Sequence, residues 1–435
     1  MVGYNLKLGW QSLRRTPVLS SLAIAAIALG IGVATTCVTI HYLLAGDPLP
    51  GKSDRLFYVR LDSWDPERPF DSDFPERPPN QLTYRDALAA VVESDIPARK
   101  AAMFRARLYL HPEGAQPFSA DTRVTTRDFF ALFAVPFRFG DAWSAEAEAR
   151  GEAQVVLSAE INRKLFGEAN SVGRTIKIDQ QIFTVAGVLA PWRPALKFYD
   201  IHNGSERSPE EIYIPFALAR PLGIVNAGNT SSWGQGWQTV DGKYDSEAVW
   251  LQGWVELESD SQKQAYQSFL DQYTDGQRAA GRFQRKNNNQ LQPMRAWHQQ
   301  EEAVPPSAKS LMVIALAFLG ICAVNLIGLL LGKFLARAPE VGVRRALGAS
   351  RAAVFVQHLV ECELTAVGGG LAGILLSWGV LGVINRALEG DVHYRLDLPM
   401  IGTGFGLTLV AGLVAGLYPA WRICSVPPAT HLKLQ

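Results

Sequence analysis

The stretch "TPVLSSLAIAAIALGIGVATTCVTIHYLLAG", residues 16–46, decides the fold class. It runs for 31 residues without Lys, Arg, Asp or Glu, whereas about 20 apolar residues are enough to cross the hydrocarbon core of a bilayer. It is also much longer than the apolar core of a cleaved signal peptide, which has about 7 to 15 residues, and no A-x-A cleavage site follows it. The stretch therefore predicts a helix that stays in the membrane.

Three further runs lack acidic and basic side chains other than His, and each is longer than the roughly 18 residues that a span needs. These runs are residues 310–332, 364–385 and 398–421. The sequence therefore predicts a membrane protein with four transmembrane α-helices and a large mixed α+β extracytoplasmic domain between the first two. The predicted spans are 18–46, 307–332, 359–385 and 398–421.

Basic residues lie beside three of the predicted span ends. The amphipathic N-terminal segment 1–17 has three Lys and Arg and no acid, the loop 333–358 has five and one acid, and the tail 422–435 has two. The short loop 386–397 is balanced, with two basic and three acidic residues. Because Lys and Arg are enriched in cytoplasmic loops, both termini and the loop 333–358 are predicted to be cytoplasmic. The loop 386–397 is then external.

The same topology places residues 47–306 outside. This segment has 29 Lys and Arg against 35 Asp and Glu, and none of the four cysteines. "VVLSAEINRKLFG" (155–167) reads as a strand followed by a short helix that Ser158 caps and Gly167 ends. "RTIKI" and "IFTVAGV" then alternate like two paired strands. The near-neutral whole chain, at +1, lacks the basic stripe of a nucleic-acid-binding protein.

Two stretches of the external segment leave alternatives open. Trp233, Trp237, Trp250 and Trp254 form either a ligand-binding aromatic surface or the core of a small lobe. The polar, basic segment 276–290 is either a solvated loop or a tip that docks a partner.

Small and acidic residues in the spans also have two interpretations. Glycines four residues apart allow close helix packing, within one subunit or across a dimer; the pairs are Gly328/Gly332, Gly369/Gly373 and Gly412/Gly416. Glu361 and Glu363 start the third span, and we expect them to reach the interface, with Arg351 or His358 close enough to pair. A structural or coupling role is the preferred interpretation for Glu361.

Residues Gly46, Gly51, Lys52 and Ser53 match the G-x-x-x-x-G-K-[ST] spacing of a phosphate-binding loop. We interpret the match as chance, because two prolines inside the loop have no N–H to offer and a strand-like stretch follows where a helix is required. The sequence contains neither H-E-x-x-H nor G-x-S-x-G. It therefore predicts no catalytic residue, no metal site and no cofactor bound by this chain.

The loop 333–358 contains "PEVGVRRALGASR" (339–351). Glu340 to Leu347 predict a short helix that Gly348 ends, and Ser350 caps the next helix. Val343, Ala346 and Leu347 share one face, so this helix could insert into a groove of a soluble partner. The pattern alone equally fits a plain loop whose arginines only orient the spans.

These residues carry a resemblance. "PEVGVRRALGASR" resembles the segment E-[IV]-G-x-x-R-A-L-G-A of the FtsX/MacB-type permeases of ABC transporters. "VVLSAEINRKLFG" with "SVGRTIKIDQQIFTVAGVL", and "FFALFAVPFRFGDAW" before them, resemble the exported domain of that family. The N-terminal "NLKLGWQSLRRTPVLSSLAIAAIALGIG" and the C-terminal "YPAWRICSVPPATHL" are similar to its first and last spans. The resemblance covers nearly the whole chain.

The resemblance implies a permease subunit, not an enzyme, in the bacterial cytoplasmic (inner) membrane. It implies a dimer, with a second copy or a related permease, and cytoplasmic ABC ATPase subunits that bind ATP and Mg²⁺. A periplasmic adaptor protein is a further candidate partner. Family members use the helix after the second span to couple to the ATPase; the corresponding residues are Glu340, Val341, Gly342, Arg344, Arg345, Ala346, Leu347 and Gly348. Pro339 departs from the family pattern, which more often has a charged residue there.

Two functions follow from the resemblance. The first is export or extraction of a substrate, driven by ATP hydrolysis that moves the external domain, which is mechanotransmission. The second is mechanical regulation, in which that domain switches a periplasmic cell-wall hydrolase or sensor and nothing is transported. Only 17 residues precede the first span and no LSGGQ-like signature is present, so the ATPase is expected on a separate polypeptide.

Overall fold

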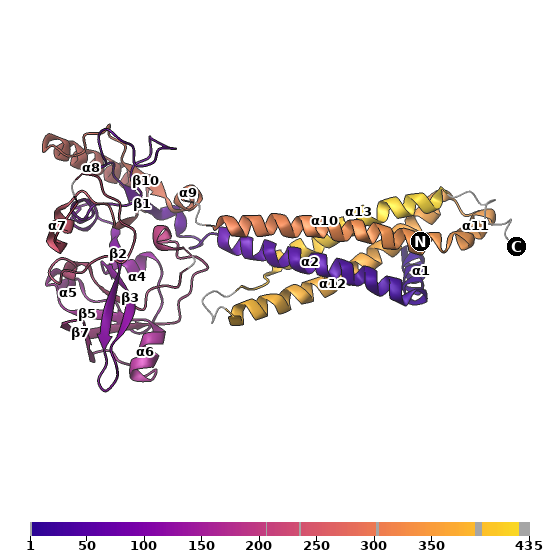
Figure 1. Ribbon diagram of the computed structural model, residues 1–435, viewed down its shortest axis with the longest axis horizontal. Coiled ribbons are helices and arrows are strands. Elements are labelled where there is room, and N and C mark those ends of the chain that lie inside the picture. Colours follow the sequence, from indigo (N-terminus) through magenta and orange to yellow (C-terminus); the bar gives the residue numbers. More distant parts are fainter. Residues whose placement is uncertain (1, 206, 235, 302–303, 388–393, 426–435) are drawn as a thin grey trace. The chain divides into compact units, whose positions relative to one another are not determined.

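The computed structural model describes residues 2–205, 207–234, 236–301, 304–387 and 394–425. The chain divides into two compact units, a helical unit (residues 1–46 and 304–435) and a sheet unit (residues 47–303). Figure 1 shows the long helices of the first unit and the strands and short helices of the second. The predicted fold class, four apolar helices with a mixed α+β domain between the first two, is confirmed. Much of the predicted loop 386–397 and tail 422–435 lies outside the described residues.

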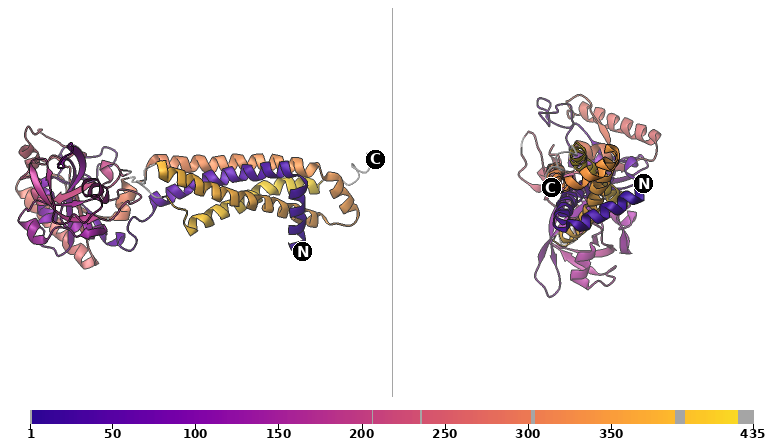
Figure 2. Two further views of the ribbon diagram at one scale, coloured as in Figure 1. Left: turned by 90° about the horizontal axis from the view of Figure 1, so that it is seen from below. Right: turned by 90° about the vertical axis from the view of Figure 1, so that its right-hand side faces the viewer.

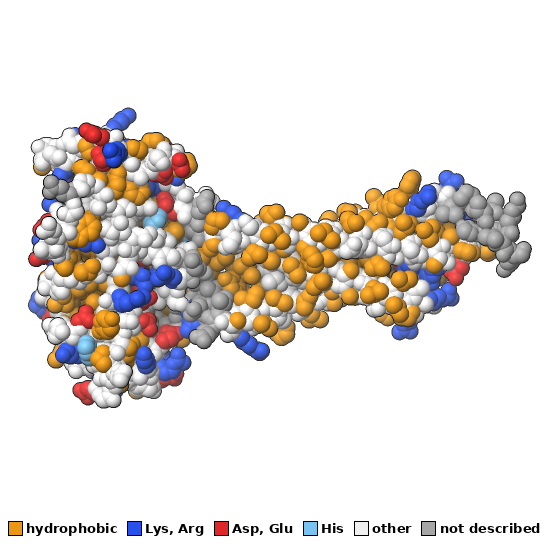
Figure 3. All heavy atoms as spheres, in the orientation of Figure 1, with side chains coloured by type: hydrophobic (Ala, Val, Ile, Leu, Met, Phe, Trp, Pro, Cys, Tyr) orange, Lys and Arg blue, Asp and Glu red, His pale blue; other side chains and the backbone are white. Residues whose placement is uncertain are grey.

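Six helices form the described part of the helical unit. They are α1 (Val2–Arg15), α2 (Pro17–Ala45), α10 (Pro306–Leu335), α11 (Ala338–Ala346), α12 (Arg351–Ala387) and α13 (Leu398–Cys424). Helices α2, α10, α12 and α13 are long and apolar enough to cross a membrane. Figure 3 shows their largely apolar surface, with Lys and Arg gathered at the end that carries α1 and α11. α12 begins at Arg351, so most of the predicted loop 333–358 is helical.

Two of the glycine pairs pack inside the chain. A Cβ added to Gly369 would meet Ile27 Cβ at 2.6 Å, and one added to Gly416 would meet Cys362 Cβ at 2.6 Å. Gly328 and Gly332 differ, because a Cβ added to either would meet nothing within 4 Å. The pairs Gly369/Gly373 and Gly412/Gly416 therefore pack helices within one subunit, whereas the pair Gly328/Gly332 lies on an open face of α10.

The sheet unit is built on one sheet. Its described strands are β1 (Leu56–Arg60), β2 (Arg99–His111), β3 (Phe118–Thr125), β4 (Phe137–Gly140), β5 (Gln154–Leu157), β6 (Thr175–Ile178), β7 (Gln181–Leu189), β8 (Ile212–Pro215), β9 (Gln252–Glu256) and β10 (Gln290–Pro293). Its α-helices are α3 (Tyr84–Ala87), α4 (Asp128–Leu132), α5 (Ala145–Ala149), α6 (Ala159–Phe166), α7 (Val240–Asp245), α8 (Asp260–Ala279) and α9 (Met294–Gln300).

The strands pair in the order β10-β1-β9-β2-β3-β8-β5-β7-β4, with β6 beside β2 and β7. Most neighbours are antiparallel, whereas β3–β8 and β5–β7 are parallel. Successive side chains of a strand point to opposite faces of the sheet. On β1, Phe57 and Val59 accordingly pack into one core with α8, and Leu56 and Tyr58 into a second core with α4 and α9. The sheet is therefore buried on both faces.

The predicted unit at 155–189 forms as expected. Ser158 Oγ accepts a hydrogen bond from Ile161 N at the start of α6, and Gly167 ends the helix with a left-handed φ of 65°. β6 and β7 pair as an antiparallel hairpin. These features were predictable because each depends on neighbours a few residues away.

The structure shows how the tryptophans and the segment 276–290, which the sequence left open, contribute to the packing of this unit. Trp250 and Trp254 are 1% and 0% exposed, so they belong to the cores. Trp237 packs half-buried against the first core, and the half-buried Trp233 donates to Ser63 O. The segment 276–290 is not a freely solvated loop, because Arg282 bonds Asp86 at 2.9 Å and Arg285 bonds Asp62 at 3.1 Å. The basic side chains of this segment fix it to the sheet unit.

Candidate coupling site at one end of the helical unit

The predicted helix at 340–347 is present as α11. It begins two residues earlier, because Pro339 occupies the first turn, where its missing N–H costs no hydrogen bond. Gly348 ends it with a left-handed φ of 102°, a conformation that favours glycine. Ser350 Oγ then accepts a hydrogen bond from Ala353 N at 3.1 Å, which starts α12.

α11 has two different faces. Ala338 and Val341 are 4% and 8% exposed and pack into the core of the helical unit, and Gly342 is buried beside them. Val343 and Leu347 are 49% and 83% exposed, and Ala346 is exposed with them. The predicted residues are therefore divided, with one set anchoring the helix and the other left uncovered.

The two arginines of α11 hold the helix to its neighbours. Arg345 donates to Cys424 O at the end of α13, at 3.0 Å. Arg344 donates to Gln357 Oε1 on α12, at 3.1 Å. Because both arginines lie in the last turn of α11, they also suit the negative end of its dipole. These two bonds link α11 to α12 and to α13.

A buried ion-pair cluster lies next to α11; we call Ser12, Lys333, Arg337 and Glu361 the Glu361 cluster. Glu361 Oε1 is 2.7 Å from Lys333 Nζ and 3.8 Å from Arg337 Nη1, and it accepts a hydrogen bond from Ser12 Oγ. Arg337 also donates to Ser12 Oγ. Arg337 directly precedes α11, so the cluster joins α11 to α1, α10 and α12.

The expected pairing of Glu361 with Arg351 or His358 is wrong. The carboxylate turns inward to α10 and α1, while His358 Nδ1 contacts Val354 O at 2.9 Å on its own helix. The His358 ring meets Phe334 edge-on, with centroids 4.6 Å apart. Glu363 is also turned inward, and both its carboxylate oxygens are buried without a hydrogen-bond partner among the residues the structure describes.

α1 reaches the cluster because it breaks away from α2. Thr16 precedes Pro17, and the residue before a proline is disfavoured from helical geometry. Figure 2 shows α1 crossing the end of α2. Gly9 lets α1 approach α12 closely, since a Cβ there would meet Leu364 Cδ1 at 2.7 Å. Gly9 and Ser12 were not singled out from the sequence, which gives no sign of what they touch.

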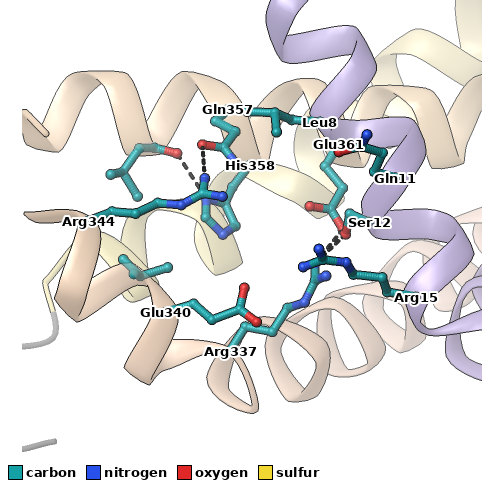
Figure 4. Close-up of a pocket in the computed structure, with 12 residues that line it drawn as sticks. Leu8, Gln11, Ser12, Arg15, Arg337, Glu340, Arg344, Gln357, His358 and Glu361 are labelled. Atoms are coloured by element: carbon teal, nitrogen blue, oxygen red, sulfur yellow. Dashed lines mark hydrogen bonds and ion pairs between the residues drawn. The ribbon is translucent and has the colours of Figure 1, made fainter.

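A small pocket of about 70 Å³ opens between α1, α11 and α12. Figure 4 shows Arg15, Arg337 and Glu340 pointing toward it, with Ser12 and Glu361 at its wall. Three of the predicted residues line this pocket, Glu340, Val341 and Arg344, and Glu340 and Arg344 are exposed at its rim. The pocket therefore lies where α11 and α12 meet α1.

The residues that match the phosphate-binding loop, from Gly46 to Ser53, do not form such a loop in the structure. Gly46 follows helix α2 and strand β1 follows Ser53, the reverse of the strand-loop-helix order that the motif needs. Lys52 Nζ donates to Ala131 O at 2.5 Å and lies 3.4 Å from Glu256, and Ser53 Oγ donates to Asp47. Among the described residues, no three His, Cys, Asp or Glu side chains gather as a metal site.

Two family models match this chain. The MacB-like periplasmic core domain matches residues 20–272, and the FtsX-like permease C-terminal domain matches residues 312–428. The first match alone covers more than half of the chain, and the second contains α11, α12 and α13.

Known proteins of the same kind are similar over most of the chain. The pyoverdine export ATP-binding/permease protein PvdT of Pseudomonas aeruginosa is 26% identical over 71% of this chain and 41% of its own length. The macrolide export ATP-binding/permease protein MacB of Syntrophobacter fumaroxidans is 26% identical over 81% of this chain and 53% of its own length. The chain therefore spans about two-fifths to one-half of the length of the curated relatives it matches.

Among solved structures, the periplasmic region of MacB from Actinobacillus actinomycetemcomitans matches 59% of this chain and 96% of its own, at 12% identity and a TM-score of 0.36. The extracellular domain of the ABC-type transporter YknZ from Gram-positive bacteria matches 54% of this chain and 98% of its own, at 13% identity and a TM-score of 0.33. From the family-model matches and the four apolar helices, this chain belongs to the FtsX/MacB-type family of ABC transporter permeases.

Proposed function

We propose that this chain is a permease subunit that couples ATP hydrolysis by a separate cytoplasmic ATPase to motion of residues 47–303, and so exports or extracts a substrate by mechanotransmission. The observation that carries the proposal is the division of α11. Val341 anchors the helix in the bundle, while Leu347 stands 83% exposed beyond it. An exposed, anchored apolar helix end suits insertion into a groove of a partner protein.

The connections of α11 supply a route for the motion. Arg337, Arg344 and Arg345 bond residues of α1, α12 and α13, and Glu361 adds α10 through Lys333. Helices α2 and α10 lead along the chain to the two ends of the sheet unit. A displacement of α11 would therefore move helices that continue into residues 47–303.

The orientation follows from charge. The end of the helical unit that holds α11 also carries Arg14, Arg15, Arg344 and Arg345. Lys and Arg are enriched on the cytoplasmic side of membrane proteins, which supports a cytoplasmic position for this end and for both termini. ATP and Mg²⁺ would then bind to the ATPase partner and not to this chain. Export as the purpose is supported by the relatives, which are named for the export of pyoverdine and of macrolides.

Co-purification tests the proposal. The chain is expressed with its genomic neighbours, isolated in nanodiscs, and its bound proteins are identified by mass spectrometry. An ATPase in equal amount, whose ATP hydrolysis changes when the permease is present, is the expected result. A chain that elutes without any ATPase and stimulates none would overturn the coupling role of α11.

A further inference from the structure

The pocket between α1, α11 and α12 has an excess of positive charge on its wall. Its charged lining residues are Arg15, Arg337, Arg344, Glu340 and Glu361. Glu361 is already paired, because its carboxylate lies 2.7 Å from Lys333 Nζ. The three guanidinium groups therefore face one further carboxylate, that of Glu340, which is exposed at the rim.

Two of these arginines have no acidic partner. Arg15 makes no hydrogen bond or ion pair with another residue that the structure describes. Within the same described part of the chain, Arg344 donates only to the neutral amide oxygen of Gln357, at 3.1 Å. Arginine keeps its charge in proteins, and its strongest hydrogen bonds go to carboxylate and phosphate oxygens. The pocket therefore offers charged donors to an anion that the described chain does not supply.

The size of the pocket limits what that anion can be. Its volume is about 70 Å³, whereas sites that enclose a drug-sized ligand measure roughly 300–1,000 Å³. It suits one small anionic group and not a nucleotide. A phosphate is the group that matches several guanidinium groups at once, because it presents oxygens in more than one direction.

His358 adds a different kind of group to the same wall. Its side chain lines the pocket and is 5% exposed, and its Nδ1 lies 2.9 Å from Val354 O. A carbonyl oxygen only accepts, so in the neutral ring Nδ1 carries the proton and Nε2 is an acceptor. Nε2 has no partner among the residues that the structure describes. A hydroxyl group next to the phosphate would supply the missing donor.

The surroundings of α1 are those of a membrane surface. Arg15 ends α1, and on the next helix Val18 and Leu22 are already 69% and 52% exposed. Trp10 on α1 is 56% exposed, and Arg14 lies over its ring at 5.3 Å. Exposed Trp and basic side chains on an amphipathic helix are typical of the layer where lipid head groups meet water. A phosphate beside Arg15 is therefore close to both head groups and lipid chains.

We infer that this pocket binds an anionic phospholipid whose head group carries a hydroxyl, such as phosphatidylglycerol. The phosphate lies between Arg15 and Arg344, beside Arg337, and a glycerol hydroxyl donates to His358 Nε2. Basic pockets between membrane helices on the cytoplasmic side suit acidic head groups. The bound lipid joins α1 to α11. This inference rests on the proposed membrane permease and adds a lipid ligand to its coupling site.

Native mass spectrometry of the full chain in detergent tests the site. We expect phosphatidylglycerol to bind at least tenfold more tightly than zwitterionic phosphatidylethanolamine. Arg15→Gln and Arg344→Gln should each weaken its binding about fivefold, the usual contribution of one basic residue near an anionic lipid. Arg14→Gln is the matched control, because it removes the same charge from α1 but Arg14 does not line the pocket. Equal weakening by Arg14→Gln, or none by Arg15→Gln, would overturn the site.

Two further ligands identify the source of the phosphate and the role of the hydroxyl. Excess inorganic phosphate should leave phosphatidylglycerol bound, and displacement would assign the pocket to free phosphate and overturn the lipid. Phosphatidylmethanol has the same charge but no head-group hydroxyl, so it should bind several-fold more weakly. Equal binding of the two lipids would overturn the contact with His358.

ATPase co-purification is measured on the wild type and on Arg15→Gln. Weaker lipid binding by Arg15→Gln with the ATPase still bound supports the lipid site independently of coupling. Absence of the ATPase from every sample, with lipid still bound to the wild type, contradicts the proposed function and not the lipid site. Release of the lipid when the ATPase binds would show that the ATPase fills the pocket, and would overturn the lipid as its occupant.

Discussion

The ammonium group of Lys333 lies 2.7 Å from the carboxylate of Glu361, and both side chains are 3% exposed. Lys333 also donates to Ser20 Oγ on α2 at 3.1 Å. A buried ion pair adds little net stability, yet removal of one member leaves an uncompensated charge and costs about 3–5 kcal/mol. The pair therefore fixes how α2, α10 and α12 meet more than it strengthens the bundle.

Lys333→Met should lower the free energy of unfolding by about 3 kcal/mol. The double variant Lys333→Met/Glu361→Gln should cost less than the two single variants together, because neither charge of the Lys333–Glu361 pair remains without the other. Unfolding of the detergent-solubilised protein by increasing SDS, followed by tryptophan fluorescence, measures both. Lys309→Met is the matched control, since Lys309 is exposed on the same helix. Equal destabilisation by Lys309→Met would show that the Glu361 contact is unimportant.

A second prediction concerns the docking of α1. Gly9→Val should push α1 off α12, because even a Cβ at this position comes within 2.7 Å of Leu364. Such overpacking costs about 1–3 kcal/mol, so trypsin should cleave after Arg14 and Arg15 more readily. Gly3→Val is the control, because nothing lies within 4 Å of a Cβ at Gly3. Similar cleavage of both variants would mean that α1 does not depend on this close approach.

The spans, α11 and its caps could be predicted because their signals are local. Pro339, Gly348 and Ser350 act on residues one to four positions away. The partners of Glu361 could not be predicted this way. Ser12 lies 349 residues away in sequence, and a helix offers Arg351 or His358 as equally good partners until the packing of α10 and α1 is known. The partners of Glu361 depend on how the carboxylate is buried, and that burial arises only when the helices pack together.

The exposed face of α11 illustrates the same limit. Helical spacing places Val343 and Leu347 together, and the structure leaves both uncovered. Spacing alone did not indicate that Val341 and Gly342 would turn into the bundle instead, because the sequence shows an apolar position and not what covers it. Which side of α11 remains exposed depends on the positions of the ends of α10 and α12, to which α11 is connected.

A third prediction concerns acid stability of the sheet unit. Burial lowers the pKa of His202 from 6.5 to about 4. The Glu301 carboxylate, 3.5 Å from His202 Nε2, favours the protonated ring, so burial outweighs it. Between pH 6.5 and pH 4 the unfolded chain therefore binds a proton that the folded chain does not. Stability is lost as the pH falls through this window, by about 3 kcal/mol in total from this group.

His202→Gln should remove that contribution. Urea unfolding of the full chain, followed by tryptophan fluorescence at pH 7, 5.5 and 4.5, should show a shallower loss of stability in the variant. Groups common to both proteins cancel in the comparison. A pH dependence identical to that of the wild type would show that His202 takes up its proton as easily when folded as when unfolded.

The last prediction separates coupling from folding on α11. Leu347→Asp places a charge where the side chain is 83% exposed, so insertion and stability should be unchanged. If Leu347 enters a groove of the ATPase, the charge must be desolvated there, and binding should weaken at least tenfold. Stimulation of ATP hydrolysis by the purified permease should fall accordingly. Val341→Asp is the matched control, because Val341 is 8% exposed and anchors α11; it should lower the yield and the unfolding midpoint. Full stimulation by Leu347→Asp would move the ATPase contact to another part of the chain.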